Sequence, residues 1–319
     1  MIARYSVIFF LVMGFIVVPF ISYFLCSKLL NRRYGRRVGI ALACVIIGLV
    51  LYGMTIGFSQ FHVKHMEFAS KDLPEAFDGY RIVQFSDAHV ATYDGFLDDV
   101  LPRAIDSIQA QKADMIVFTG DLQNLYPEEL ESKVSLLRKL HAPDGVYSIL
   151  GNHDYSIYID ADEATKKKND LKTQQLERKM NWTLLMNENR IIRRDSDSIV
   201  IAGMENWGVQ KRMPRNGDVR KTMKGISPKS FTVMLQHDPN AWREKILPQC
   251  NAQLTLSGHT HGGQFSLFGW NPANFTYSEC FGTYHEGDRA IYVSSGLGGL
   301  IPFRLGQPGE IVVITLRKK

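Results

Sequence analysis

The chain has 319 residues, of which 45% are hydrophobic and 22% are charged, and this composition excludes extensive disorder. Its net charge is +5, but no Asp or Glu precedes Glu67, so the positive excess is concentrated at the N-terminus. A positive bias confined to a hydrophobic segment is more typical of a membrane protein, whose orientation it sets, than of a nucleic-acid-binding protein.

Two uncharged apolar stretches occupy the first sixty residues, at positions 7–26 and 38–58. Each is about 20 residues long, which is the length a helix needs to cross the hydrocarbon core of a bilayer. A secretory signal peptide is the alternative, but the first stretch is long for one and a second stretch follows it. We therefore expect residues 1–60 to form a membrane anchor of two transmembrane helices, and residues 61–319 to form a separate folded domain.

The loop between the two stretches, residues 27–37, predicts the orientation of the chain. It contains five positive charges and no negative ones. Short loops rich in Lys and Arg stay in the cytoplasm. We expect a multi-pass protein of the cell membrane whose folded domain lies outside the cytoplasm.

Beyond the anchor, short β-rich runs alternate with helix-like stretches. The expected strands are residues 81–87, 115–121, 146–150, 199–203, 231–236, 254–257, 290–294 and 310–316. The expected helices are residues 97–111 and 128–140. A further helix candidate at 166–180 is strongly charged, and we expect it to be a face exposed to solvent. This alternation predicts an α/β sheet with helices outside it. Ligands of such sheets gather beyond the C-terminal ends of the strands.

Polar side chains follow five of these runs. The sets are Asp87–Ala88–His89, Gly120–Asp121, Gly151–Asn152–His153–Asp154, Gln236–His237–Asp238 and Gly258–His259–Thr260–His261. One such set is ordinary turn chemistry or a structural histidine, but five at equivalent strand ends indicate a shared site. Carboxylate, imidazole and amide ligands without thiolates suit Mn, Fe or Zn ions. A shared Asp can bridge two ions roughly 3.5–4 Å apart, the spacing of two-metal hydrolysis.

These motifs resemble those of the calcineurin-like metallophosphoesterase superfamily. DxH, GD, GNHD, an isolated His and GHxH occur in the family order within residues 82–263. The run GHTHGGQ, followed by Ser295–Gly296–Leu297–Gly298, looks most like the bacterial membrane-associated branch. The resemblance implies a four-layer α-β-β-α sandwich of two sheets flanked by helices. It also implies a metal-dependent hydrolase of phosphate esters or anhydrides.

The resemblance further implies roles for individual residues. The first metal would be held by Asp87, His89, Asp121 and His261, and the second by Asp121, Asn152, His237 and His259. His153 would be the catalytic residue, donating a proton to the leaving oxygen or stabilising charge on the phosphoryl group. The two ions would neutralise phosphoryl charge and lower the pKa of a bridging water, whose hydroxide would attack.

One position departs from the family pattern. Several branches have a second Asp three residues after the bridging Asp, where it orients the catalytic His, but this chain has Asn124. An Asn can hydrogen-bond an imidazole but cannot stabilise the imidazolium by charge. Asn124 and Asp154 are both candidates for orienting His153.

The motifs indicate the reaction class but not the substrate. A basic run at 211–224, which includes Arg212 and Arg215, is either a solvated loop or a cationic lip for an anionic headgroup or acidic lipid. Beside a membrane anchor, we expect a lipid-linked or other phosphorylated envelope substrate. No nucleic-acid partner is expected, because no stripe of basic and aromatic residues suits a strand-binding groove.

Three questions stay open at this point. With the domain inside the cell, a UDP-2,3-diacylglucosamine pyrophosphatase becomes plausible, although loop 27–37 would then face outward. A non-catalytic metal-binding module on the same fold is a second alternative, although all seven ligand positions and His153 are filled. Cys250 and Cys280 either pair in an oxidising compartment or remain separate thiols.

Overall fold

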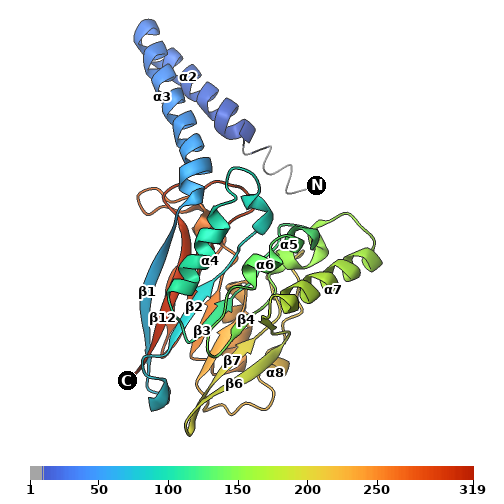
Figure 1. Cartoon of the computed structure of the whole chain (residues 1–319). Coiled ribbons are helices and arrows are strands. Elements are labelled where there is room, and N and C mark those ends of the chain that lie inside the picture. The colour runs from blue at the N-terminus through green and yellow to red at the C-terminus, as the bar shows by residue number, and fades with distance from the viewer. Residues whose placement is uncertain (1–8, 10) are drawn as a thin grey trace.

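The computed structural model describes residues 9 and 11–319. Figure 1 shows two N-terminal helices projecting from one end of a body built on β-sheets. The projecting elements are η1 (Met13–Val17), α2 (Val18–Leu29), α3 (Arg32–Tyr52) and η2 (Gly53–Gly57). The side chain of Asn31 accepts a hydrogen bond from the Arg33 N–H and so caps the start of α3. At Gly39 the backbone of α3 approaches α2 so closely that a Cβ would lie 2.9 Å from the Tyr23 Cα.

One helix within the described residues is long and apolar enough to cross a membrane. It runs from Arg33 to Gly57 with 25 residues, its most apolar 18-residue window has a mean hydropathy of 2.4, and it overlaps the span expected at 38–58. The other expected span, 7–26, overlaps a shorter apolar helix at Met13–Leu29, and its residues 7, 8 and 10 lie outside the described part. Two transmembrane helices are therefore not confirmed.

The body contains two six-stranded sheets, which confirms the mixed α/β class. The first has the order β1 (Phe61–Ser70), β12 (Gly309–Lys318), β2 (Arg81–Phe85), β3 (Met115–Phe118), β4 (Val146–Ser148) and β5 (Thr183–Leu184). The second has the order β10 (Gly282–Glu286), β11 (Arg289–Val293), β9 (Leu254–Ser257), β8 (Thr232–Leu235), β7 (Asp197–Gly203) and β6 (Glu188–Arg194). The sequence did not predict β1, β5, β6 or β10.

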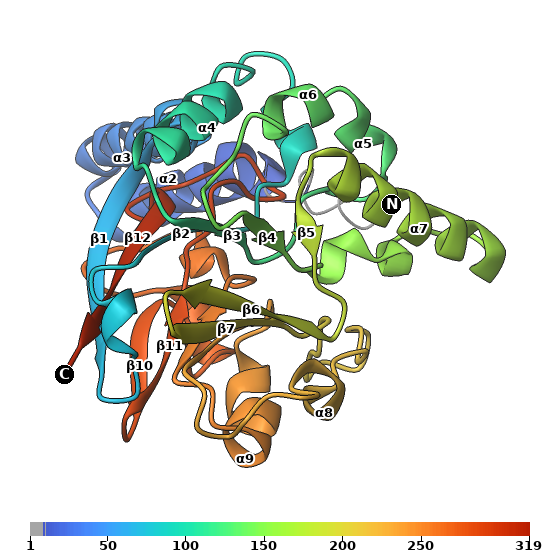
Figure 2. The same cartoon turned by 60° about the horizontal axis from the view of Figure 1, so that its bottom comes forward.

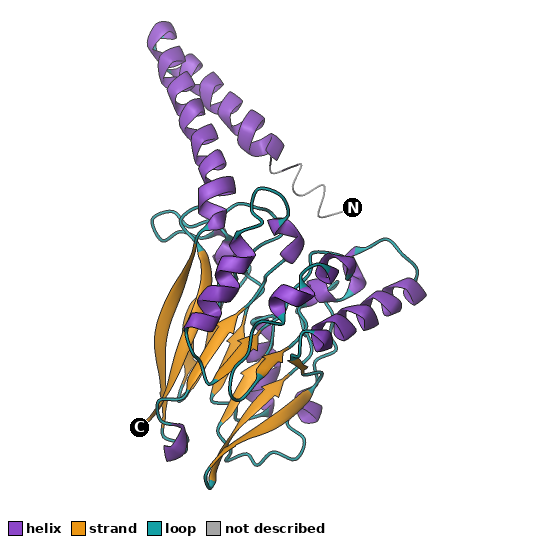
Figure 3. Ribbon diagram, viewed as in Figure 1, coloured by secondary structure: helices purple, strands orange, loops and turns teal. Residues whose placement is uncertain are grey.

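Helices cover the outer face of each sheet (Figures 2 and 3). The first sheet is covered by α4 (Val100–Ala110), α5 (Glu128–Glu131), α6 (Val134–Leu137) and α7 (Glu163–Lys179), and the second by α8 (Val219–Thr222), η7 (Trp242–Ile246) and α9 (Leu247–Gln249). The remaining single turns are η3 (Glu75–Phe77), η4 (Val90–Tyr93), η5 (Asn152–Asp154), η6 (Ser156–Tyr158), η8 (His261–Gly263) and η9 (Pro272–Phe275). The expected helix at 128–140 is divided into α5 and α6.

Adjacent residues of the central strands pack into different cores. Ile82 joins the core between the two sheets, whereas Val83 joins the core beneath the helices. A strand that is buried on both faces has a continuous run of apolar residues, and this pattern predicted β2 and β3 from the sequence. The charged stretch at 166–180 is not wholly a solvated face, because α7 buries Thr173, Leu176 and Glu177.

Strand direction decides which end of the body carries the strand-end motifs. β1 begins four residues after η2 ends and runs away from the N-terminal helices. β12 is parallel to β1 and antiparallel to β2, and β3 and β4 are parallel to β2. The C-terminal ends of β2, β3 and β4 therefore point back toward α3.

A buried cation holds the loops at this end together. The Arg304 side chain is fully enclosed, and its two terminal nitrogens donate hydrogen bonds to the carbonyls of His261, Ser295, Gly296, Gly298, Gln307 and Pro308. Burial lowers the pKa of Arg304 to about 10, so the side chain stays charged at neutral pH. Cys250 and Cys280 are free thiols.

Replacing Arg304 with Met should destabilise the body, because buried carbonyls that lose their donor have no access to water. We expect a loss of about 3 kcal/mol in unfolding free energy. Thermal and denaturant unfolding of the detergent-solubilised chain would measure it, with exposed Arg138→Met as the matched control. Equal stability of the two variants would contradict the structural role of the Arg304 hydrogen bonds.

Candidate metal centre

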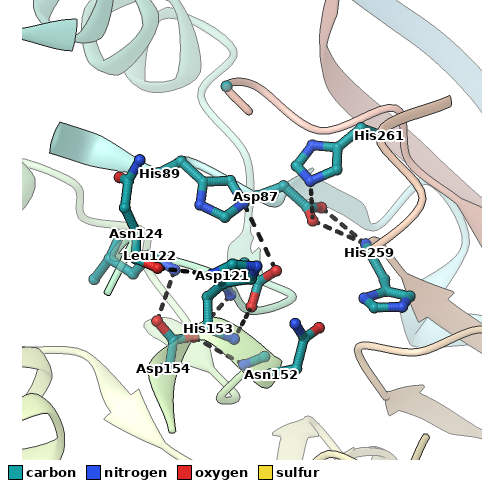
Figure 4. Close-up of polar contacts among 12 residues, drawn as sticks. Asp87, His89, Asp121, Leu122, Asn124, Asn152, His153, Asp154, His259 and His261 are labelled. Carbon is teal, nitrogen blue, oxygen red and sulfur yellow. Dashed lines mark hydrogen bonds and ion pairs between the residues drawn. The ribbon is translucent and has the colours of Figure 1, made fainter. Parts of the chain in front are cut away.

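The loops after β2, β3, β4, β8 and β9 bring the sequence motifs into one place (Figure 4). Two groups of side chains each have one ligand atom per residue within 4.8 Å of the others. The first group is Asp87, His89, Asp121 and His261, and the second is Asp121, His237 and His259. Asp121 belongs to both groups.

Five of these residues adopt the left-handed backbone conformation. Their φ angles are 51° for Asp87, 44° for His89, 62° for Asp121, 75° for His259 and 54° for His261. This conformation costs a non-glycine residue about 1 kcal/mol. Such strained residues cluster at functional sites, where the surrounding structure maintains them.

The Asp121 carboxylate lies at the middle of the cluster. Its Oδ2 atom is 3.2 Å from His237 Nε2 and 3.7 Å from His89 Nε2, and its Oδ1 accepts the His153 N–H at 2.7 Å. Asn152, the amide expected to act as a ligand, places its Oδ1 at 3.1 Å from the same His237 nitrogen. The carboxylate, the amide and the imidazole therefore face a common point.

The hydrogen bonding of the imidazoles fits a bound cation. His237 Nδ1 lies 2.7 Å from the Thr119 carbonyl and donates its proton there, so Nε2 is the nitrogen that would bind a metal after losing its own proton. That Nε2 lies 3.2 Å from His259 Nδ1, while His259 Nε2 lies 2.9 Å from the Tyr277 hydroxyl. Both ring nitrogens of His89 are buried without a hydrogen-bond partner. A buried unpaired nitrogen is costly, and a divalent metal would satisfy it.

Burial and mutual charge set the protonation of the histidines. Burial and the nearby His153 lower the pKa of His89 to about 3, and burial also lowers the pKa values of His259 and His261. Burial also disfavours the charged form of His237, but the Asp121 carboxylate raises the pKa of His237 to about 10. Three of the imidazoles are therefore neutral at pH 7, and a metal bound at His237 displaces a proton.

Asp154 connects two of the loops but does not orient the His153 ring. Its buried carboxylate accepts backbone N–H bonds from Asp121, Leu122, Gln123 and Gly151, at 2.7 to 3.2 Å. Gly151 is required for the same approach, because a Cβ there would overlap the Asp121 side chain. Asp154 thus holds the GNHD turn against the loop that carries Asp121.

The His153 imidazole is oriented by a backbone carbonyl. Its Nδ1 lies 2.7 Å from the carbonyl of Asn124, so the Nε2 atom remains available to act on a substrate. The Asn124 side chain points elsewhere and bonds the Ala91 N–H and the Thr92 hydroxyl. The ring also stacks on Tyr158, with centroids 4.6 Å apart.

A carboxylate that the sequence analysis did not identify supports this contact. Glu129 accepts the N–H groups of Asn124, Leu125 and Tyr126 at 2.6, 3.1 and 3.1 Å. The Leu125 N–H belongs to the peptide unit whose carbonyl faces His153. A negative charge on the N–H side of a peptide strengthens its carbonyl as an acceptor. Burial raises the pKa of Glu129.

The basic segment borders the cluster, but neither Arg212 nor Arg215 contacts a candidate ligand. Arg215 lies over the Trp207 ring at 5.5 Å and donates to the carbonyls of Gly208 and Val209, whereas Arg212 is exposed. Met213 of the same segment lies 3.5 Å from the Tyr158 hydroxyl. No local pattern marked Tyr158 or Tyr277, because single tyrosines in loops carry no spacing signal.

Comparison with known proteins places these residues in a family context. Residues 80–263, more than half of the chain, match the calcineurin-like phosphoesterase family. The chain is 33% identical to the uncharacterized metallophosphoesterase YkuE of Bacillus subtilis over 91% of its own length and 99% of that protein. It is 29% identical to a transmembrane protein with metallophosphoesterase domain of Danio rerio, covering 92% of this chain and 68% of that one. It is 27% identical to UDP-2,3-diacylglucosamine pyrophosphatase LpxG of Chlamydia trachomatis, covering 76% of this chain and 86% of that one.

Glu129→Gln should weaken the support of His153 without disturbing the metal ligands. We expect turnover of bis-(p-nitrophenyl) phosphate with Mn to fall about tenfold, as for one lost charge-assisted hydrogen bond. KM, metal content and melting temperature should be unchanged. The matched control is Glu131→Gln, an exposed residue of the same helix that pairs with Lys172. A parallel loss of metal would instead show that Glu129 maintains the ligand loops.

Proposed function

The chain belongs to the calcineurin-like phosphoesterase family and is a metal-dependent phosphoesterase, and we propose that it is anchored in the cell membrane and hydrolyses a lipid-linked or envelope-associated phosphate. In this proposal residues 1–60 are the anchor and residues 61–319 the catalytic domain. The observation that carries the proposal is the direction of β2, β3 and β4. Their C-terminal ends, which bear Asp87, Asp121 and Asn152, face the end from which the apolar helices project.

The ligand assignment follows the two side-chain groups of the site. We assign one ion to Asp87, His89, Asp121 and His261, and a second ion to Asp121, Asn152, His237 and His259. The family uses a binuclear divalent centre, and these nitrogen and oxygen donors suit Mn, Fe or Zn. Such ions supply Lewis acidity and an activated water to phosphate hydrolysis.

In the proposed mechanism His153 acts on the leaving group. Its Nδ1 proton is held by the Asn124 carbonyl, and its backbone N–H is held by Asp121 Oδ1. Because neither contact involves Nε2, this nitrogen is the atom of the ring that is available to react. From there the imidazole can donate a proton to the leaving oxygen or stabilise charge on the phosphoryl group. Because the Asn124 carbonyl is neutral, it selects the tautomer and the orientation but adds no full negative charge.

Membrane association has support beyond the apolar helix. One relative is named as a transmembrane protein, and its similarity covers 92% of this chain. We infer a multi-pass arrangement with the catalytic domain outside the cytoplasm, because the loop 27–37 carries five positive charges. The second candidate function is a cytoplasm-facing UDP-2,3-diacylglucosamine pyrophosphatase, which the 27% identity to the enzyme of that name favours.

His153→Ala should lose turnover but keep the metals. We expect kcat on bis-(p-nitrophenyl) phosphate to fall about 100-fold or more, as is typical for removal of a general acid. Elemental analysis of the purified variant should show unchanged metal content. Exposed His141→Ala is the matched control. Loss of one ion per chain would move His153 into the ligand set, and a wild-type protein inactive with Mn would favour the non-catalytic module.

The orientation can be tested with fusions after Lys319. We expect alkaline phosphatase at this position to be active and green fluorescent protein to be dark, because the C-terminus lies in the same body as the site. Matched fusions after Asn31, in the loop between α2 and α3, should give the opposite pattern. The reverse result at Lys319 would contradict the charge argument and make the UDP-linked lipid precursor the leading substrate.

A further inference from the structure

A group of large apolar side chains follows the metal ligand motif GHTHGG and is exposed to solvent. We call Leu267, Phe268, Trp270 and Phe275, together with the half-buried Phe265 that packs on Trp270, the apolar rim. Phe268 is 100% exposed, Phe275 82%, Trp270 52% and Leu267 50%. Residues 262–278 contain no Asp, Glu, Lys or Arg. Contiguous exposed apolar surface of this kind marks an interaction site.

The apolar rim has a defined conformation. Leu267 and Trp270 exchange two backbone hydrogen bonds, of 3.0 and 2.9 Å, and enclose a two-residue turn. Both turn residues have positive φ, 51° at Phe268 and 81° at Gly269. The Trp270 ring packs edge-to-face on Phe265 and Phe275, with centroids 6.0 and 6.2 Å apart. The chain thus holds a phenylalanine outward at a position where a bulky residue is strained.

The apolar rim is joined to the base of the apolar helix. Gln264 donates hydrogen bonds to the carbonyls of Ile301 and Phe303, and the Arg304 N–H donates to Gly53 at the end of that helix. Figure 1 shows the orange and red loops of this region beside the lower end of α3. A cavity of about 370 Å³, lined by Gly263, Gln264, Phe265, Ile301 and Phe303, lies at this junction.

The same segment is joined to the metal centre at both of its ends. It begins at His261, a residue of the first ligand group, and it reaches Tyr277, whose hydroxyl contacts His259. The segment that carries the exposed aromatic side chains is therefore joined to the metal centre at both ends and to the base of the apolar helix through Gln264.

We propose that the apolar rim is immersed in the lipid interface beside α3, so that the metal centre opens toward the bilayer and receives its substrate from it. The occupant of this surface is lipid, because the rim is uncharged and is joined, through Gln264 and residues 301–304, to the end of a helix whose most apolar 18-residue window has a mean hydropathy of 2.4. Tryptophan and other aromatic side chains are typical of this interfacial depth. The inference rests on the membrane anchoring of the proposed function; the position of the rim is independent of the phosphoesterase activity, whereas the route of the substrate requires it.

Fluorescence quenching by brominated lipids tests the position of the rim directly. The full-length chain would be reconstituted in phosphatidylcholine vesicles with bromines on the acyl chains. Trp182 and Trp242 are buried in the body and Trp270 is exposed. We expect the brominated lipids to quench the tryptophan fluorescence of the wild type. Most of this quenching should be lost in Trp270→Phe and retained in the matched control Trp207→Phe. Equal quenching in wild type and Trp270→Phe would overturn the proposal.

A second copy of the chain is the competing occupant. Phe268→Cys would be treated with a short bifunctional thiol reagent in the same vesicles, with Phe96→Cys as the control for random collision. Efficient cross-linking only at Phe268, with no lipid quenching of Trp270, would show a protein contact and overturn the proposal. Absence of specific cross-linking together with quenching supports it.

Activity separates this inference from the proposed function. The double variant Phe268→Ser, Phe275→Ser should lower the ratio of activity on a phosphatidyl ester in vesicles to activity on bis-(p-nitrophenyl) phosphate several-fold. An unchanged ratio would overturn the proposal. A wild type that is inactive on both substrates with Mn would refute the proposed function, whereas the quenching result would still decide the position of the rim.

Discussion

The carboxylate of Asp121 has to remain ionised in an enclosed position, because it belongs to both groups of candidate ligands. Removing such a charge from water costs several kcal/mol unless nearby groups compensate. Burial opposes its ionisation, but His237 and His153 outweigh that effect and hold the pKa of Asp121 well below its ordinary value. The His153 backbone N–H also stabilises this charge, because it donates a hydrogen bond to Asp121 Oδ1. The surrounding loops have to keep these donors in place, and most local features of the site follow from that requirement.

Asp154 and the glycines show how the loops meet this requirement. A second buried carboxylate beside Asp121 is unfavourable, and burial together with the Asp121 charge raises the pKa of Asp154 to about 7. Four backbone N–H groups compensate, and they come from both loops that Asp154 joins. At Gly120 a Cβ would lie 2.5 Å from the Gly151 nitrogen. The motifs GD and GNHD are therefore one packed unit, in which the glycines allow two backbones to approach and the final Asp binds them.

The sequence predicted which side chains the strand-end loops bring together, because their grouping depends on chain direction. Residues that follow parallel strands meet at one edge of a sheet, so Asp87, Asp121 and Asn152 could be grouped without coordinates. The orientation of His153 was different. Its partner is the backbone carbonyl of Asn124, and residue type says nothing about where a carbonyl points. Glu129 acts on the same peptide through N–H groups and was missed for the same reason. The edge strand β1 was missed because its half-buried alternation at 61–70 is weaker than a continuous apolar run.

The path of β1 also determines which end of the body faces the apolar N-terminal helices. Because β1 starts just after η2 and pairs with β12 over ten residues, it fixes the direction of the whole first sheet relative to α3. The strand-end loops then face the end of the body from which α3 projects. The apolar rim is joined to the helix base, whereas part of the basic segment lies on α8 over the outer face of the second sheet, and Arg215 lies over the Trp207 ring. Under the proposed membrane anchoring, this arrangement favours substrates that the bilayer holds by their apolar part, and their phosphate would reach the metal centre from the membrane side.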